Sequence, residues 1–285
     1  MKINSNMPLA AIVLTLCMLL FAGCEKEKSE EIWDAIIQDV HRKDYLVEII
    51  SWFDDSTNYH VSTYEYDSLN LLRRIENVGK IYEASQAKPF KYVVTFEYND
   101  GLLSEIVETA CEPRYYQLPP IRFYYNQEGK VTCMDYYGTM VYFGYHHGRI
   151  DSVYNGDDPE TYSILKYDNR GNVVKVISRV REYDMIEQPT GRYLFRTTEY
   201  AYDQHSRPFF NLDGIPYQPI YGEGGFGNGI EISRSLSNNN LIRSGLSKWE
   251  YTYDTNGLPA TIFFQFGDVV PLNHPMNSLT YKKIR

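Results

Sequence analysis

Cysteine, tryptophan and histidine are scarce in this chain, whose 285 residues include four Cys, three Trp and six His. Motifs of the G-x-S-x-G and H-E-x-x-H kinds are absent, which removes the familiar signatures of serine hydrolases and zinc proteases. Lys and Arg number 28 against 37 Asp and Glu, for a net charge of −9. Because no dense basic cluster appears either, the composition argues against a nucleic-acid partner.

Long hydrophobic runs are also missing, apart from residues 9–22 near the N-terminus. That run is too short to span a membrane, which takes about 20 apolar residues, and it fits a secretory signal. The sequence "LFAGC" at its end resembles a bacterial lipobox, which implies cleavage after residue 23 and lipid on Cys24. An ordinary signal peptide with a chance cysteine is the alternative.

A charged stretch, "EKEKSEE", follows Cys24, and residues 24–31 are interpreted as a lipidated cysteine with an acidic tether. The stretch is similar to the acidic export tag that sends some lipoproteins of Gram-negative bacteria to the outer face of the outer membrane. The expected location is therefore the outer membrane, exposed at the cell surface. A plain hydrophilic spacer remains the alternative.

The remaining cysteines raise the question of a disulfide. Cys17 lies in the signal and Cys24 takes the lipid, which leaves Cys111 and Cys133 in an oxidising compartment. They belong to adjacent repeat units, so they form either a bridge or two separately buried thiols. Neither arrangement predicts a bound metal.

An internal repeat dominates the rest of the sequence. Each copy opens on an aromatic or aliphatic residue, one intervening residue and a tyrosine, followed by turn residues and an apolar stretch. Seven copies align: "YEYDSLNLLRRI" from Tyr64, "FEYNDGLLSEI" from Phe96, "FYYNQEGKVTCM" from Phe123, "FGYHHGRIDSV" from Phe143, "LKYDNRGNVVKV" from Leu165, "YAYDQHSRPFF" from Tyr200 and "YTYDTNGLPATI" from Tyr251.

Each copy has the chemistry of a β-hairpin. Residues two apart in a strand face the same side, so the paired aromatics define one buried face. Asp or Asn then favours a turn, and Gly or Asn accepts the positive φ at its exit. Apolar residues follow at the second and fifth positions past the glycine, as in Leu103 and Ile106. That spacing breaks strict alternation, which predicts a β-bulge just after each turn.

The pattern Y-x-Y-D-x-x-G-x-[LV] resembles the YD (Rhs-type) repeat, a β-hairpin module of bacterial surface and toxin-shell proteins. A lipobox followed by degenerate YD hairpins is similar to a family of secreted bacterial lipoproteins. The resemblance covers residues 45–285 unevenly and implies an architecture, not an activity. The copies are irregularly spaced and the chain is short, so a closed Rhs shell is not expected.

These patterns predict an all-β fold in which residues 32–285 form one domain. We expect an antiparallel meander of hairpins, curved into an open sheet or half-barrel with the tyrosines on its packed face. The polar faces are too charged for the lipid-facing band of an outer-membrane barrel. Residues 30–43 have helical spacing and predict a short helix, and residues 213–245 predict a long loop.

Several chemical motifs occur in contexts that do not support them. Gly222, Gly224 and Gly227 spell G-x-G-x-x-G without the strand and helix of a nucleotide site. Ser163 and Lys166 spell S-x-x-K on an expected strand, where positions three apart face opposite sides. Turn chemistry accounts for His146 and His147, and for the calcium-like loops "DNRGN" and "DTNG". We therefore expect no metal and no cofactor.

Two functional hypotheses follow. The first is a non-enzymatic binding or structural lipoprotein of the cell envelope, held to the membrane by its lipid, with a glycan or an envelope protein as partner. The candidate ligand contacts are Tyr217, Tyr221, Phe226 and Trp249, in and beside the 213–245 loop. The second hypothesis is a secreted carbohydrate-active hydrolase on a β scaffold, because two distant carboxylates can converge in a fold. No catalytic residue and no oligomeric state follow from the sequence.

Overall fold

The computed structural model describes residues 44–53, 59–83, 86–112, 115–184, 188–212, 214–217, 229–267 and 276–284. The chain divides into two units, Met1–His41 and Arg42–Arg285, and every described residue belongs to the second. The predicted signal peptide, Cys24, the 24–31 tether and the 30–43 helix therefore lie outside the described residues. Tyr221 and Phe226 lie outside them as well.

The described chain is almost entirely antiparallel β-structure, as predicted. Its strands are β1 (Tyr45–Phe53), β2 (Tyr59–Tyr66), β3 (Leu72–Glu83), β4 (Gln86–Asn99), β5 (Leu102–Glu112), β6 (Tyr116–Gln117), β7 (Ile121–Tyr125), β8 (Val131–Tyr136), β9 (Thr139–His146), β10 (Arg149–Asn155), β11 (Tyr162–Tyr167), β12 (Val173–Tyr183), β13 (Pro189–Ser206), β14 (Asn239–Ser244), β15 (Ser247–Tyr253), β16 (Pro259–Phe266) and β17 (Asn277–Lys283). One helix, α2 (Gly229–Leu236), is found in this part of the chain. No helix among the described residues is long and apolar enough to cross a membrane.

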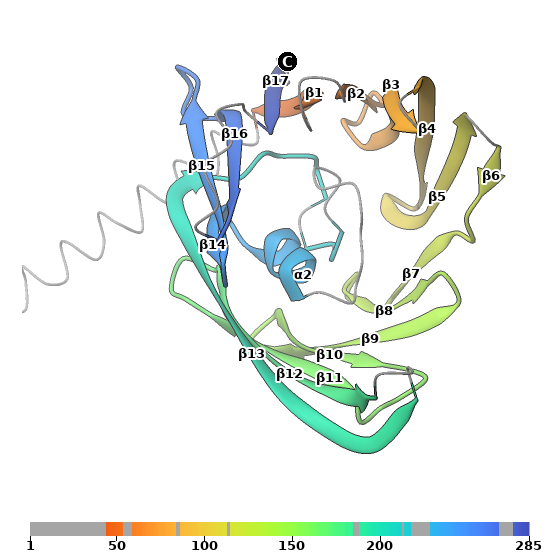
Figure 1. The fold of residues 1–285 in the computed structure, drawn as a ribbon, viewed down its shortest axis with the longest axis vertical. Coiled ribbons are helices and arrows are strands. Elements are labelled where there is room, and N and C mark those ends of the chain that lie inside the picture. Colours follow the sequence, from red (N-terminus) through yellow and green to blue (C-terminus); the bar gives the residue numbers. More distant parts are fainter. Residues whose placement is uncertain are drawn as a thin grey trace, which may run out of the picture. The chain divides into compact units, whose positions relative to one another are not determined.

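The sheet closes on itself (Figure 1). Strand β6 pairs only with β5, and the other 16 strands form a continuous ring of antiparallel neighbours. The ring is sealed where β1 pairs β17, from Tyr45 opposite Lys283 to Trp52 opposite Asn277. The predicted open sheet or half-barrel is therefore wrong, because the first and last strands carry the edge hydrogen bonds that an open sheet leaves unpaired.

Six of the seven repeat copies are hairpins with the predicted turn. The turn carboxylate or amide accepts backbone N–H bonds, as when Asp168 accepts from Arg170 and Asn172. The residue at the turn exit has a positive φ in every one of these six copies, at Asn70, Gly101, Gly129, Gly148, Gly171 and Gly257. The calcium-like loops are thus self-bonded turns, as expected.

The predicted bulges are present. The register shifts at the second aromatic of a copy, so that Tyr98 lies opposite Leu103 although Glu97 lies opposite Glu105. The same shift occurs at Tyr66, Tyr125 and Tyr167. The extra residue restores the alternation, which lets both post-turn apolar side chains point inward.

The third residue of every copy is tyrosine, and its hydroxyl donates a hydrogen bond in six of the seven copies, Tyr98 being the exception among the described residues. In four copies the hydroxyl donates to a backbone carbonyl on the return strand of the preceding hairpin, at distances of 2.5–2.9 Å. The pairs are Tyr125 with Leu103, Tyr145 with Val131, Tyr167 with Ile150 and Tyr202 with Val173. Each acceptor lies opposite the previous copy's bulge, so the hydroxyl bonds a carbonyl at that irregularity.

Removing one of these hydroxyls is expected to cost stability without changing shape. Tyr125→Phe should lower the free energy of unfolding by about 1 kcal/mol, because the part-buried carbonyl of Leu103 loses its donor. Urea unfolding measures the change. Tyr142→Phe is the control, since that ring is 46% exposed on the outer wall and should change stability by less than about 0.5 kcal/mol. Equal effects of the two variants would contradict a structural role for the hydroxyl.

The sixth copy is not a tight hairpin, contrary to prediction. After Ser206 the chain turns into the barrel and pairs with β13 again only through β14, where Asn239 lies opposite Ser206. The entering residues pack on the far wall: the Phe210 ring lies 5.3 Å from that of Tyr64, and the carbonyl of Phe209 accepts from the N–H of Val47. We call residues 207–217 the plug segment.

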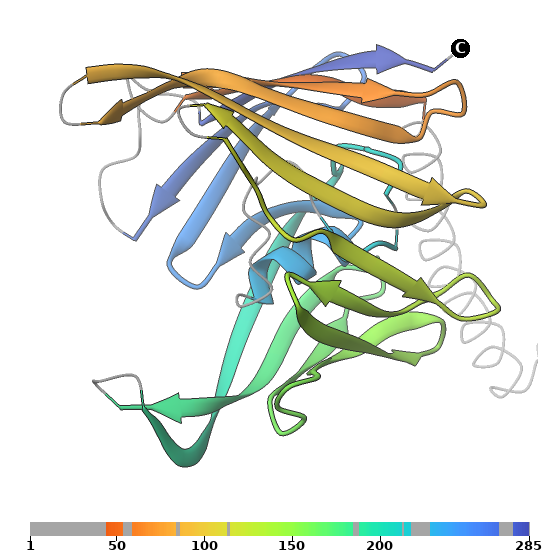
Figure 2. The same cartoon turned by 90° about the vertical axis from the view of Figure 1, so that its right-hand side faces the viewer.

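Helix α2 continues the filling of the barrel, and Figures 1 and 2 both show it inside the ring. Ser233 and Ser235 of α2 and Ser237 just after it are fully buried, because small side chains let this segment approach the wall closely. The Ser237 hydroxyl accepts from the N–H of Val173 at 2.9 Å. The predicted loop at 213–245 is thus replaced, over its described residues, by a buried turn, a helix and a strand.

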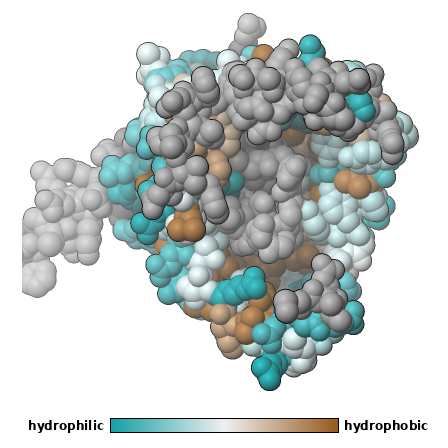
Figure 3. Space-filling view, in the orientation of Figure 1, coloured by the Kyte–Doolittle hydropathy of each residue, from teal (hydrophilic) through white to brown (hydrophobic). Residues whose placement is uncertain are grey.

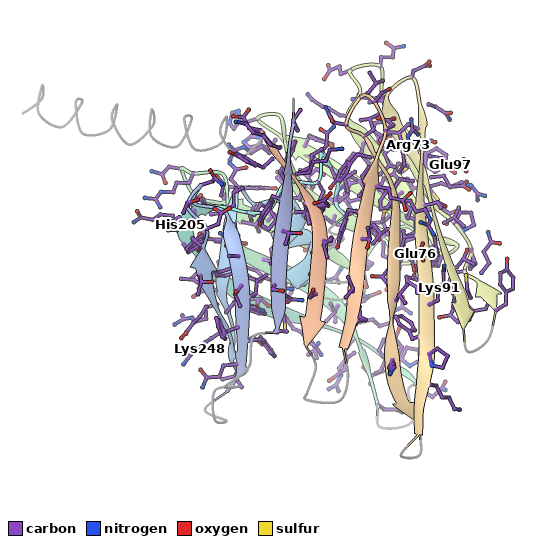
Figure 4. The ribbon with its side chains drawn as sticks, turned by 90° about the horizontal axis from the view of Figure 1, so that it is seen from above. Arg73, Glu76, Lys91, Glu97, His205 and Lys248 are labelled. Carbon is purple, nitrogen blue, oxygen red and sulfur yellow. The ribbon has the colours of Figure 1, made fainter. Side chains whose placement is uncertain are left out.

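The outer wall is polar and charged. Arg74 is paired with Glu65 at 2.5 Å and also with Glu76, which itself bonds Lys91 at 2.7 Å across β2, β3 and β4. A second ladder links Arg122 to Glu105 and Asp135 across β5, β7 and β8. Figure 4 shows Glu76 and Lys91 beside one another on this wall, and the flanks in Figure 3 are mostly teal and pale. The apolar face of the sheet is inward.

Candidate binding site at one rim of the barrel

The two rims of the barrel are formed by different sets of connections. The repeat turns gather at one of them, which we call the turn rim. The other connections, including the β8–β9 turn and the β12–β13 tip, lie at the opposite rim. Toward this opposite rim, Glu108 points inward from β5 with only 7% of its surface exposed. It is the only buried carboxylate among the described residues.

Two tyrosine hydroxyls hold the Glu108 carboxylate. Tyr92 of β4 donates to its Oε2, and Tyr137 of the β8–β9 turn also bonds it. Burial and then the bond to Glu108 raise the pKa of Tyr92 and of Tyr137 far above the usual value for tyrosine. Both phenols therefore remain protonated donors at any physiological pH, as a carboxylate acceptor requires.

Further aromatic rings surround the carboxylate. Tyr217 of the plug segment packs edge-on against Phe96 at 5.9 Å, and Tyr136 packs on Tyr137 at 4.5 Å. Tyr116 of β6 lies close enough to interact electrostatically with Tyr137 and is 51% exposed. We call this set the rim cluster: Tyr92, Glu108, Tyr116, Tyr136, Tyr137 and Tyr217.

The rim cluster runs from solvent into the barrel wall. Tyr116 and its neighbour Tyr115, which is 73% exposed, form the outer end, and Glu108 with Tyr217 forms the buried end. The N–H of Leu118 donates to the carbonyl of Glu108, which fixes this segment against β5. Rings that stack and a carboxylate that accepts hydrogen bonds suit a ligand with C–H faces and hydroxyl groups. The described residues contain no group of three or more metal-ligating side chains.

The structure separates the predicted contact residues. Tyr217 belongs to the rim cluster, although it is 9% exposed and packs as a core residue. Trp249 is 6% exposed on β15, where the Arg234 guanidinium of α2 lies 4.4 Å from its ring. Trp249 and the rim cluster are therefore not one site, and contact with Trp249 would require α2 to move.

The strand register does not allow the Cys111–Cys133 bridge. Cys133 lies opposite Tyr124 on β7, and Arg122 of that strand lies opposite Glu105 on β5. Cys133 is therefore level with the start of β5, while Cys111 is near its end, about 25 Å farther along at roughly 3.3 Å per residue. Both are free thiols in the structure, and burial raises the pKa of Cys133.

Sequence reasoning missed Glu108, Tyr92 and Tyr137. The signal for Glu108 was present in the alternation of β5, where Ile106 and Ala110 on either side are buried. An acidic side chain in a row of inward-facing positions marks a buried polar group that needs hydrogen-bond partners. The donors themselves were not predictable, because Tyr137 comes from a turn on another hairpin.

Comparisons with known proteins support the fold. No protein-family model matches this chain, and no curated protein matches it. Among solved structures, it is similar to a porin-like protein from Bacteroides uniformis, with 12% identity over 84% of this chain and 97% of that one and a TM-score of 0.50. A porin-like protein from Bacteroides vulgatus follows, at 14% identity, 85% and 100% coverage and a TM-score of 0.40. The TcdB2–TccC3 structure matches 79% of this chain with 10% of its own length, at 13% identity and a TM-score of 0.32. The first likeness supports a closed antiparallel barrel and extends to the fold alone.

Proposed function

We propose that this protein is a non-enzymatic binding lipoprotein of the cell envelope, whose plugged barrel captures a hydroxyl-rich ligand such as a glycan at the rim cluster. The observation that carries the proposal is Glu108, a buried carboxylate bonded by Tyr92 and Tyr137, with the exposed ring of Tyr116 beside Tyr137. Such a site costs desolvation free energy that a plain apolar core does not.

The charged outer wall supports an aqueous setting for the barrel. A lysine or arginine facing lipid costs about 2–4 kcal/mol at the bilayer midplane, and the two outer ladders contain three such residues, Arg74, Lys91 and Arg122. A barrel of this surface needs a separate anchor, which the lipid on Cys24 supplies. The proposed location is the outer membrane of a Gram-negative bacterium, at the cell surface, and the proposed family is that of YD-type lipoproteins.

The filled interior supports binding over transport. Rings of 16 or more strands leave a channel when nothing occupies them, and here the plug segment and α2 pack inside. The hydrolase alternative is not proposed, since a glycosidase pair needs two carboxylates flanking one bond. Glu108 has no second buried carboxylate beside it in the described part of the chain.

The binding test compares two glutamates of the same strand. Residues 25–285 are applied to a glycan array together with Glu108→Gln and Glu105→Gln, whose side chains face inward and outward from β5 respectively. We expect saturable binding by the parent protein, a loss of about tenfold or more in Glu108→Gln, and no change in Glu105→Gln. Circular dichroism confirms that each variant is folded. Absence of binding by the folded parent, or equal loss in both variants, would overturn the proposed ligand class.

The anchoring and transport predictions have their own readouts. Radiolabelled palmitate should be incorporated into the full-length protein and not into the Cys24→Ala variant, and that variant should also be lost from the membrane fraction.

Purified protein added to a planar bilayer should give no stepwise conductance. Channel openings that depend on the intact chain would contradict a water-exposed, filled barrel.

A further inference from the structure

One hairpin extends beyond the barrel wall. Strands β12 and β13 pair from Lys175 opposite Glu199 to Tyr183 opposite Pro189, and Figure 2 shows them reaching past the neighbouring strands. On its other side β13 pairs β14 only from Tyr200 onward. Over residues 189–199, the backbone edge that faces away from β12 therefore has no strand partner in the described part of the chain. We call this stretch the free edge.

Over residues 192–199 the free edge has no proline, no lysine and no covering strand in the described part of the chain; its charged residues are Arg192, Arg196 and Glu199, and the register irregularity of this hairpin lies toward the tip, between Arg181 and Tyr183. Proline, lysine, bulges or a covering segment normally prevent an edge from pairing with another chain. Here Pro189 and Gly191 are confined to the tip, and the run "RYLFRTTE" from Arg192 to Glu199 is rich in aromatic and β-branched residues. Leu194 is 40% exposed and Phe195 68% exposed. The edge is both available and suited to pairing.

The charge of the hairpin indicates the kind of partner. Its paired strands, residues 173–183 and 189–199, hold five basic residues and two acidic ones, in a chain whose net charge is −9. Arg179 forms an ion pair with Glu160, and Arg181 forms one with Asp158. The basic residues that remain on β13 are Arg192 and Arg196.

Arg192 and Arg196 are exposed, and neither has an ion-pair partner within the described residues. They lie on the same face of β13, on either side of Leu194, because residues two apart in a strand share a face. A second copy of this chain would place its own Arg192 and Arg196 against these two arginines, and the like charges would repel. The arrangement therefore favours an acidic strand that carries an apolar residue between two carboxylates.

We propose that the free edge of β13 accepts an extended acidic segment of a partner protein as an added β-strand. The backbone groups of residues 189–199 supply the pairing, and Leu194 with Arg192 and Arg196 supplies the selection. This docking site is independent of the rim cluster and does not require the proposed ligand there.

The test uses a short fluorescein-labelled acidic peptide in which every second residue is Thr and the residues between are Glu, Val and Glu in that order. A second, basic peptide has Lys at both Glu positions. Fluorescence polarisation should detect the acidic peptide and not the basic one. Arg192→Glu combined with Arg196→Glu should weaken the acidic peptide by about tenfold or more. The matched control, Arg243→Glu with Lys248→Glu, makes the same change of charge on β14 and β15 and should leave affinity unchanged.

Hydrogen exchange separates strand addition from simple attraction of charges. On binding the acidic peptide, backbone amides within residues 192–198 should exchange more slowly, and those of the control site should not. Equal weakening in both double variants, or binding without protection of the β13 amides, would overturn the proposal. So would analytical ultracentrifugation that showed self-association through this edge, because the occupant would then be a second copy.

Discussion

Replacing Phe210 with alanine should lower the free energy of unfolding by about 3–5 kcal/mol, the range found for large aromatic side chains removed from a packed core. Phe210 is 2% exposed and packs on Tyr64 at 5.3 Å, so it joins the plug segment to the wall built by β1–β5. The expected loss of stability has two parts, the apolar contacts that are removed and the cavity that is left behind. The cavity persists because strand pairing holds the surrounding wall in place. Urea unfolding followed by circular dichroism measures it.

Phe195→Ala is the matched control for Phe210→Ala. The same atoms are removed, but Phe195 is 68% exposed on the projecting hairpin, and the expected change is below about 0.5 kcal/mol. A Phe210 variant no less stable than the Phe195 variant would mean that the plug segment contributes little to the folded barrel. Its position inside the ring would then need another explanation.

The second large effect is expected at Asn172. This side chain is 1% exposed, and its Oδ1 accepts from the N–H groups of Asn238 and Asn239 at 3.0 and 2.9 Å. Its Nδ2 donates to Asp168 at 3.1 Å and to the Asn239 side chain at 2.9 Å. Asn172→Ala should destabilise the protein by about 3 kcal/mol, because it leaves two backbone donors without an acceptor.

The control for Asn172 is an asparagine at the matching turn of another copy. Asn256 is exposed, and Asn256→Ala should cost less than about 0.5 kcal/mol. Thermal unfolding of both variants, with the melting temperature as readout, gives the comparison. If the two variants have the same melting temperature, the Asn172 amide does not join the turn of the fifth copy to the end of α2.

Local features of the fold were predictable because their causes are local. The positive φ at Gly101 and Gly171, the self-bonded Asp turns and the bulge after each turn all arise within about ten residues of chain. Hairpin formation needs only those residues, and the repeat presented the same chemistry seven times. The agreement of several copies made each single assignment stronger.

Closure and filling were not predictable by the same reasoning. Tyr45 meets Lys283 from the far end of the sequence, and no turn residue marks the β1–β17 pairing. The sixth copy carries the Asp of a hairpin turn at position 203, yet here that carboxylate accepts from Asn240 after a long excursion through the barrel. Gly and Asn near 213–245 indicated a loop, whereas burial of its described aromatic residues, such as Tyr217, decided the outcome.

The tyrosine hydroxyls give the barrel a direction. Tyr125, Tyr145, Tyr167 and Tyr202 each bond backward to the hairpin already made, and Tyr66 and Tyr281 do the same with Val47 and Pro259. The same joint, a tyrosine donor on one copy and a carbonyl acceptor on the copy before it, thus recurs between four successive pairs of copies, whereas the Tyr98 hydroxyl has no partner among the described residues and Tyr253 donates to the Asp203 carboxylate. Among the copies that share this joint, duplication or deletion of one hairpin would place the same donor beside the same kind of acceptor. The number of strands in the ring can therefore change without a new kind of contact between copies.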